Sequence, residues 1–181
     1  MIWRDTQERY GLISIGLHWL IAVAVTGLFV LGLWMVGLGY YHPWYQRAPD
    51  IHRSVGVLLL APMLAHLAWR YWNPRPETLG SVTERRAAAW MHRVMYVLMY
   101  LLLLSGYLIS TADGRGINVL GLFTVPASIS GLQNQADIAG ELHQWLAYVL
   151  IGLTSLHALA ALKHHFVDRD QTLKGMLSSR R

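Results

Sequence analysis

Long charge-free stretches constrain this chain more than any other feature. Four windows contain no Asp, Glu, Lys or Arg and are apolar enough to contact lipid: residues 11–45, 54–69, 94–112 and 142–162. The first exceeds, and the other three are close to, the roughly 20 residues that a helix needs to cross the hydrocarbon core of a bilayer. Only 14% of the residues are charged, whereas about a quarter are charged in a typical soluble domain. We therefore expect an integral membrane protein.

A fifth uncharged window, residues 116–136, has a different composition. It contains Pro126, three Gly, two Ser, two Gln and two Asn, which lipid tolerates only when their polar groups have partners. We expect an ordered extramembrane loop here, with a short helix at the interface. The chain is then predicted to be an all-α, integral membrane four-helix bundle, a single domain over residues 1–181. Its spans are expected at about residues 12–37, 52–72, 91–111 and 141–165.

The positions of the basic residues predict the orientation. With four spans, both termini and the second connection share one side, which carries 12 of the 15 Lys and Arg. The other side carries Arg47, Arg53 and Arg115. Because basic residues concentrate on the cytoplasmic side, both termini are expected in the cytoplasm. The net charge of +5 is thus a topology signal, and we expect no nucleic-acid partner.

Local signals mark two helix ends on the inner side. Asn73 precedes Pro74, and proline disfavours helical backbone in the residue before it, so the second helix is expected to end there. Ser81 begins a pattern, Ser-Val-Thr-Glu, that is typical of a helix start. It predicts a short inner approach to the third helix.

Histidine supplies the metal-binding side chains. The chain has nine His and no Cys, which excludes disulfides, cysteine-ligated clusters and covalent haem attachment. An ionisable residue within a span is a functional candidate by default. A single membrane histidine more often bonds a neighbouring polar group or faces headgroups, and we interpret His42 and His92 as interfacial.

The spacing of His143 and His157 indicates more. They are 14 residues apart, which is about 21 Å along a helix and about 40° short of four full turns. Both imidazoles therefore lie on nearly the same face, too far apart to share one metal ion. Two separate cofactors at two depths are predicted, with His52 matching His143 on the outer side and His18 matching His157 on the inner side. Haem iron is commonly held by histidine, and b-type haem needs no covalent link.

Small residues follow these four histidines by one helical turn. They are Ala22, Gly56, Ala147 and Ala161. A flat macrocycle beside each histidine needs this space, although small residues also serve ordinary helix packing in membranes.

Segments around these histidines resemble a known family. They read Ile15-Gly-Leu-His18-Trp-Leu, Ile51-His52-Arg-Ser-Val-Gly56, Leu142-His143-Gln-Trp-Leu-Ala and Leu156-His157-Ala-Leu-Ala-Ala-Leu-Lys-His-His. Together with an outer stretch that begins Gly114-Arg-Gly-Ile-Asn-Val, they are similar to the bacterial cytochrome b-561 family over about residues 10–177.

The resemblance implies a multi-pass protein of the bacterial inner membrane with two non-covalent b haems. It implies that His18, His52, His143 and His157 are the axial ligands of the haem iron. It also implies electron exchange with quinone, with ubiquinone as the expected acceptor. At least one type of family member oxidises superoxide, and related cytochromes serve as membrane subunits of hydrogenases and formate dehydrogenases.

Three further residues are candidates for the cofactor sites. Arg53 and Arg70 could each pair with a haem propionate, or be snorkelling topology residues. His164 lies near the His157 face at the inner mouth, where it could donate to a quinone oxygen or be a plain interfacial histidine.

The function hypothesis is electron transfer between an outer donor and the quinone pool. Superoxide is a candidate donor, although steering of this anion favours a positive outer surface and the outer side has one more acid than base. The alternative is a non-enzymatic subunit that carries electrons for a partner dehydrogenase. A proton or metal transporter would leave the 14-residue spacing of the histidines unexplained.

Overall fold

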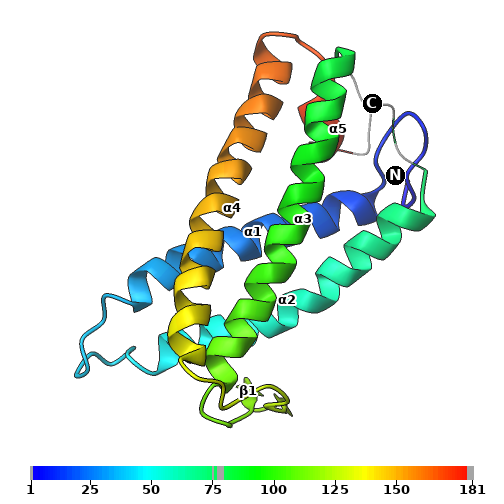
Figure 1. Ribbon diagram of the computed structural model, residues 1–181. Helices are drawn as coiled ribbons and strands as arrows, with labels where there is room; N and C mark the ends of the chain where they lie inside the picture. Colours follow the sequence, from blue (N-terminus) through cyan, green and yellow to red (C-terminus); the bar gives the residue numbers. More distant parts are fainter. Residues whose placement is uncertain (1, 75, 77–79, 179–181) are drawn as a thin grey trace. The chain divides into compact units, whose positions relative to one another are not determined.

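Four long helices dominate the computed structural model, which describes residues 2–74, 76 and 80–178. These helices are α1 (Leu12–Met35), α2 (Arg47–Trp72), α3 (Val82–Thr111) and α4 (Gln135–Phe166) (Figure 1). Each is long and apolar enough to cross a membrane, so the four-helix membrane fold is confirmed. Arg75, Arg180 and Arg181, counted on the inner side above, lie outside the described residues.

The helices extend beyond the predicted spans. Helix α2 begins at Arg47, α3 at Val82 and α4 at Gln135, where spans were expected from about residues 52, 91 and 141. Hydropathy marks only the part of a helix that needs an apolar environment. Backbone hydrogen bonds within a helix are satisfied locally, so the helix continues through the interface with charged side chains facing water.

Side chains cap the helix ends on the inner side. Ser81 Oγ accepts a hydrogen bond from the N–H of Glu84 at 3.3 Å, and the Glu84 carboxylate accepts one from the N–H of Ser81 at 2.8 Å. This reciprocal capping box confirms the helix start that the Ser81 pattern predicts. The expected short approach is, however, the first part of α3 itself. Asn73 Nδ2 donates to the Trp69 carbonyl at 3.0 Å where α2 ends.

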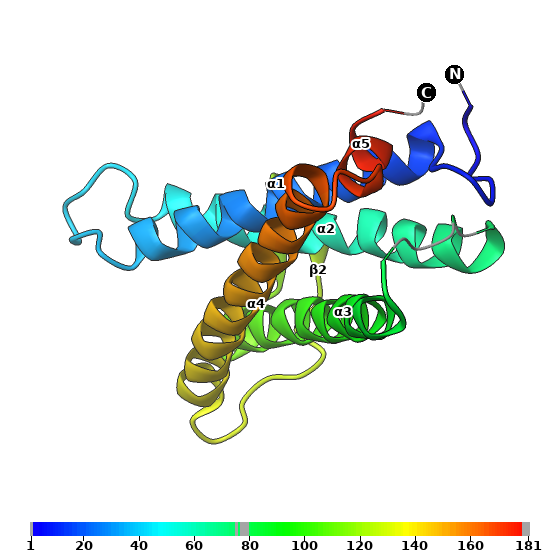
Figure 2. The same cartoon turned by 90° about the horizontal axis from the view of Figure 1, so that it is seen from above.

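The chain divides into two compact units, and each contains part of all four long helices. The terminal unit comprises residues 1–22, 61–96 and 152–181, with both chain ends. The loop unit comprises residues 23–60 and 97–151. In the terminal unit a short helix, α5 (Thr172–Leu177), lies beside the start of α1 (Figure 2), where Trp19 Nε1 donates to the Met176 carbonyl at 2.7 Å.

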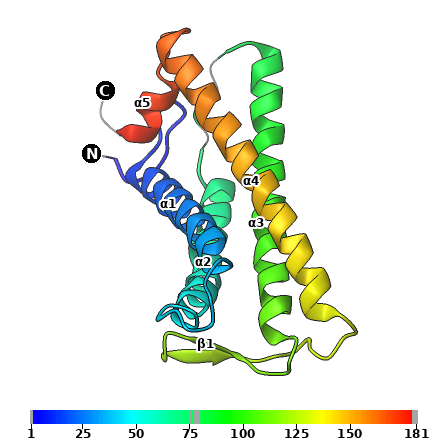
Figure 3. The same cartoon turned by 90° about the vertical axis from the view of Figure 1, so that its left-hand side faces the viewer.

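The connection between α3 and α4 is ordered, as expected, and the structure describes all of its residues. Across these described residues it contains a hairpin and no short helix. Strand β1 (Ile117–Val119) pairs antiparallel with β2 (Phe123–Val125) (Figure 3). The expectation of a helix is wrong because Ile117 and Val119 are buried alternately, which is strand periodicity. Leu120 and Gly121 then turn the chain with positive φ angles of 51° and 75°, typical of hairpin turns.

Burial within the helices fits a membrane environment. The side chains that are almost completely buried include the small polar Ser54, Ser105 and Thr111, whereas Leu20, Leu104 and many other large apolar side chains are at least half exposed. Small and polar residues are enriched between membrane helices. The exposed apolar side chains along the four long helices are therefore expected to contact lipid.

Candidate functional site

The structure contains two pairs of imidazoles, one in each unit. Within each pair, the two rings face each other. In the loop unit, the ring centres of His52 on α2 and His143 on α4 are 6.2 Å apart. In the terminal unit, those of His18 on α1 and His157 on α4 are 6.3 Å apart. These are the two pairs expected from the depth of each histidine in the membrane.

Both separations suit a metal held between two imidazoles. A metal–nitrogen bond to imidazole is about 2 Å long, and the nitrogen lies about 1 Å from its ring centre, so imidazoles on opposite sides of one metal have centres about 6 Å apart. The pairs at 6.2 and 6.3 Å fit this geometry. A third imidazole, that of His92, is 5.1 Å from His157, which is too close for these two rings to lie on opposite sides of one metal.

The imidazole of His143 has a fixed orientation. Its Nδ1 lies 3.1 Å from the Leu102 carbonyl oxygen and 3.0 Å from Ser105 Oγ. Because a carbonyl only accepts, the bond to Leu102 places the proton on Nδ1 and leaves the Nε2 lone pair for a ligand. Metal-binding histidines usually bond through their second nitrogen in this way.

The other outer imidazole, that of His52, turns its Nδ1 towards helix α1. This atom is buried, and a Cβ at Gly32 on α1 would lie 3.8 Å from it. The Leu28 carbonyl on α1 also interacts with this ring. Nε2 is therefore the nitrogen farther from α1, and the two outer imidazoles, 6.2 Å apart, fit a cofactor held between them.

Glycines let neighbouring helices approach the outer imidazoles. A Cβ at Gly106 on α3 would lie 3.3 Å from Cε1 of His143, and one at Gly32 on α1 would lie 3.4 Å from Cε1 of His52. In contrast, a Cβ at Gly56, one turn after His52, would meet nothing within 4 Å. This open space is where the sequence had suggested room for a macrocycle.

His92 and His66 occupy the terminal unit in ways that the sequence did not predict. His92 was interpreted as interfacial, but α3 begins ten residues earlier, at Val82, and His92 is half-buried against His157. His66 Nδ1 lies 2.6 Å from the Tyr96 hydroxyl, with the two rings stacked. A helix that starts at Val82 places His92 about three turns inside α3, and this position is the signal that identifies it as a residue of the inner cluster.

The two candidate arginines have different surroundings. Arg53 forms an exposed ion pair with Asp50, one turn earlier on α2. Arg70 is half-buried and near enough to His66 and His92 to interact with them electrostatically. Arg70 therefore belongs to the cluster around the inner imidazole pair.

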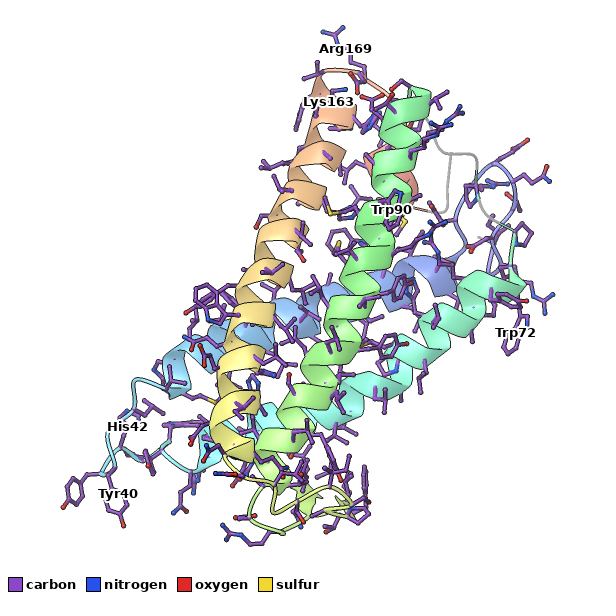
Figure 4. The ribbon with its side chains drawn as sticks, viewed as in Figure 1. Tyr40, His42, Trp72, Trp90, Lys163 and Arg169 are labelled. Carbon is purple, nitrogen blue, oxygen red and sulfur yellow. The ribbon has the colours of Figure 1, made fainter. Side chains whose placement is uncertain are left out.

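In the terminal unit, the C-terminal end of α4 carries a cluster of charged and polar side chains. Lys163, labelled in Figure 4, is one of them. His164 Nδ1 lies 2.7 Å from Asp170 Oδ2 and 3.1 Å from Asp168 Oδ2. Lys163 Nζ lies 2.8 Å from both Glu84 and Asp168. Glu84, His164 and Asp168 are close enough to hold a cation, but the Lys163 ammonium already supplies that charge.

Asp170 is ionised at neutral pH. Burial acts to raise the pKa of its carboxyl, but hydrogen bonds from Thr172 and from His164 outweigh burial and hold this pKa below its ordinary value. The partner of His164 is therefore a carboxylate anion.

Comparison with known proteins identifies the family. A family model described as prokaryotic cytochrome b561 matches residues 9–179. The chain belongs to the prokaryotic cytochrome b561 family. It is 49% identical to cytochrome b561 homolog 2 of Escherichia coli, over 98% of this chain and 95% of that protein. It is 29% identical to a probable superoxide oxidase of Yersinia pestis, over 97% and 99% of the two chains.

Membership confirms the resemblance drawn from the histidine segments. This cytochrome b561 is a multi-pass bacterial membrane protein of electron transport, and its family binds b-type haem.

Proposed function

We propose that this cytochrome b561 transfers electrons through two b-type haems, between a donor on the outer side of the bacterial inner membrane and the quinone pool. The observation that carries the proposal is the presence of two imidazole pairs, at 6.2 and 6.3 Å, that share helix α4 at two depths. A protein with one metal centre would need only one such pair, so two pairs at two depths favour two haems.

His52 and His143 would hold the outer haem, and His18 and His157 the inner haem. Haem bound there supplies one-electron exchange between ferric and ferrous iron. The protein residues set ligation and orientation: the Leu102 carbonyl fixes the His143 ring through Nδ1. Arg70, beside the inner cluster, is the stronger candidate for a propionate contact, because Arg53 is already paired with Asp50.

The close approach of α3 to the outer pair gives a first prediction. Replacing Gly106 by Val should displace the His143 ring, because even a Cβ would lie 3.3 Å from it. Overpacking of this kind costs about 1–3 kcal/mol, so outer-haem content should fall while the inner haem remains. Haem per protein, measured optically, reports this loss. Gly27→Val is the matched control, since its Cβ would meet nothing within 4 Å, and equal haem loss in both variants would contradict the prediction.

Quinone is proposed to react at the inner side, near the His18–His157 pair. An electron that enters outside must leave at the inner haem if both haems are used. Ubiquinone is the expected acceptor, and His164 is the proposed donor of a hydrogen bond to a quinone oxygen. With the 12-to-three distribution of Lys and Arg, this side faces the cytoplasm, together with both termini.

Superoxide is the proposed outer donor, supported by the relative from Yersinia pestis that is named a probable superoxide oxidase. Two of the three outer arginines, Arg53 and Arg115, form ion pairs with Asp50 and Asp113. Arg47 forms no ion pair within the described part of the chain, and it lines a pocket with Tyr40 and Tyr45. Arg47 is therefore the outer cation best placed to attract an anion.

The second candidate is a cytochrome subunit that carries electrons for a partner dehydrogenase. The paired charges of Arg53 and Arg115 favour it, because they leave little positive potential to steer superoxide. In that case electrons would arrive by contact with a partner protein.

Reduction of the purified holoprotein separates these two candidates. Superoxide from xanthine and xanthine oxidase should reduce the haems rapidly, and added ubiquinone should reoxidise them. Added superoxide dismutase should abolish the reduction, which controls for direct transfer from xanthine oxidase. If superoxide leaves the haems oxidised while ubiquinol reduces them, the subunit function is supported; if neither reduces them, the quinone proposal is wrong.

A further inference from the structure

We propose that Asp170 acts as a positioning residue, which holds the Nδ1 proton of His164 and so presents Nε2 of that ring as the proton donor to bound quinone. This inference rests on the proposed function, because it requires quinone reduction at the inner side. It assigns a task to the carboxylate cluster at the end of α4, which electron transfer alone does not use.

The position of His164 on α4 suits this task. It follows His157 by seven residues, which is about 10 Å along the helix and about 20° short of two turns. The His164 ring therefore lies on nearly the same face as the inner imidazole pair, nearer the aqueous side. Its side chain is 15% exposed, so only a small part of it contacts water.

The chain turns sharply after α4 to bring Asp170 to His164. Arg169 has a positive φ of 54°, and the N–H of Asp170 then donates to the His164 carbonyl at 3.0 Å. Asp170 Oδ1 accepts a hydrogen bond from the N–H of Thr172 at 2.8 Å, which leaves Oδ2 for His164 Nδ1 at 2.7 Å. Both carboxylate oxygens are thus fixed, and the imidazole orientation is set in advance.

The charges around His164 fit proton transfer. A carboxylate only accepts, so the bond to Asp170 keeps the proton on Nδ1 and makes Nε2 the nitrogen that exchanges protons. Asp168 also faces Nδ1, at 3.1 Å, but it shares its charge with Lys163. Lys163 is in turn paired with Glu84 of α3, so Asp170 is the carboxylate committed to the histidine.

The reaction requires such a donor. Reduction of one quinone to quinol takes two electrons and two protons, and forms two O–H bonds. The electrons come from two one-electron oxidations of the outer donor, and the protons come from water on the inner side. In its imidazolium form, His164 gives the Nε2 proton to one quinone oxygen and becomes neutral, with its remaining proton on Nδ1 beside Asp170. It then takes a new Nε2 proton from water on the inner side.

The test compares Asp170→Asn with the parent holoprotein in lipid nanodiscs. Asparagine keeps an oxygen for the Thr172 N–H but replaces the anion that holds the Nδ1 proton. General acid catalysis contributes about 10²–10⁴-fold, so reoxidation of reduced haem by ubiquinone-1 should slow at least about tenfold, with a shifted pH profile. Ferricyanide, which takes an electron and no proton, should oxidise both proteins equally. Asp137→Asn, an exposed acid at the other end of α4, is the matched control and should behave as the parent.

A second readout does not depend on turnover. In protein with ¹⁵N-labelled histidine, the His164 resonances should show a protonated Nδ1 in the parent and a changed protonation pattern in Asp170→Asn. His164→Ala should slow the quinone reaction at least as much, with both haems retained. Unchanged rate and pH profile in Asp170→Asn would overturn the inference alone. If the parent itself fails to pass electrons to ubiquinone-1, the proposed function fails as well.

Discussion

Alanine at His52 or at His143 is expected to remove one and the same haem, and alanine at His18 or at His157 the other. The reason is depth combined with distance: each pair has ring centres just over 6 Å apart, whereas His143 and His157 are separated by about 21 Å along α4. Crossed pairing would need ligands from opposite halves of the bilayer on one iron. Haem per protein should therefore fall from about two to about one in each variant, as measured from the pyridine haemochrome spectrum.

Spectra of the haem that remains identify which one was lost. His52→Ala and His143→Ala should leave the same spectrum and midpoint potential, and His18→Ala and His157→Ala a second, different set. His42→Ala, on the exposed outer connection, is the control and should keep both haems. The assignment fails if His18 and His143 affect one haem together. It also fails if His66 or His92 proves essential, and His92 is the sharper test because its ring lies 5.1 Å from His157.

The second large effect is expected in variants that lose one imidazole pair, which should separate the reaction with superoxide from the reaction with ubiquinone. His143→Ala should lose nearly all electron transfer from superoxide to ubiquinone, because the outer side then lacks its pair of ligands. The inner pair, about 21 Å away along α4, should still exchange electrons with ubiquinol. Stopped-flow spectra with superoxide, and separately with ubiquinol, measure the two half-reactions.

The reciprocal variant makes this prediction specific. His157→Ala should still be reduced by superoxide but should not be reoxidised by ubiquinone at the parent rate. Should His143→Ala keep fast superoxide-driven quinone reduction, electrons would enter at the inner side and the proposed direction of transfer would be wrong.

Several features of this cytochrome follow from sequence alone. The four spans are local properties of composition, since a charge-free run of about 20 residues has few alternatives to a membrane helix. The match of His52 with His143 and of His18 with His157 needed only the number of spans and the 3.6-residue period. Local chemistry also predicted a helix start at Ser81, which the structure confirms, although the helix that starts there is α3 itself and not a separate short approach to it.

Other features were decided only by tertiary structure. Hydropathy could not place the start of α3, so His92 was interpreted as interfacial although it packs against His157. The close contact of Gly106 with His143 depends on the rotation of α3 relative to α4, which no local pattern specifies. The bond between His164 and Asp170 depends on a positive φ at Arg169, because a single backbone angle sets the direction of the chain after α4. Sequence thus determined which residues share a depth in the membrane, and tertiary structure determined which side chains touch there, since contact depends on helix rotation and turn geometry as well as on position along the chain.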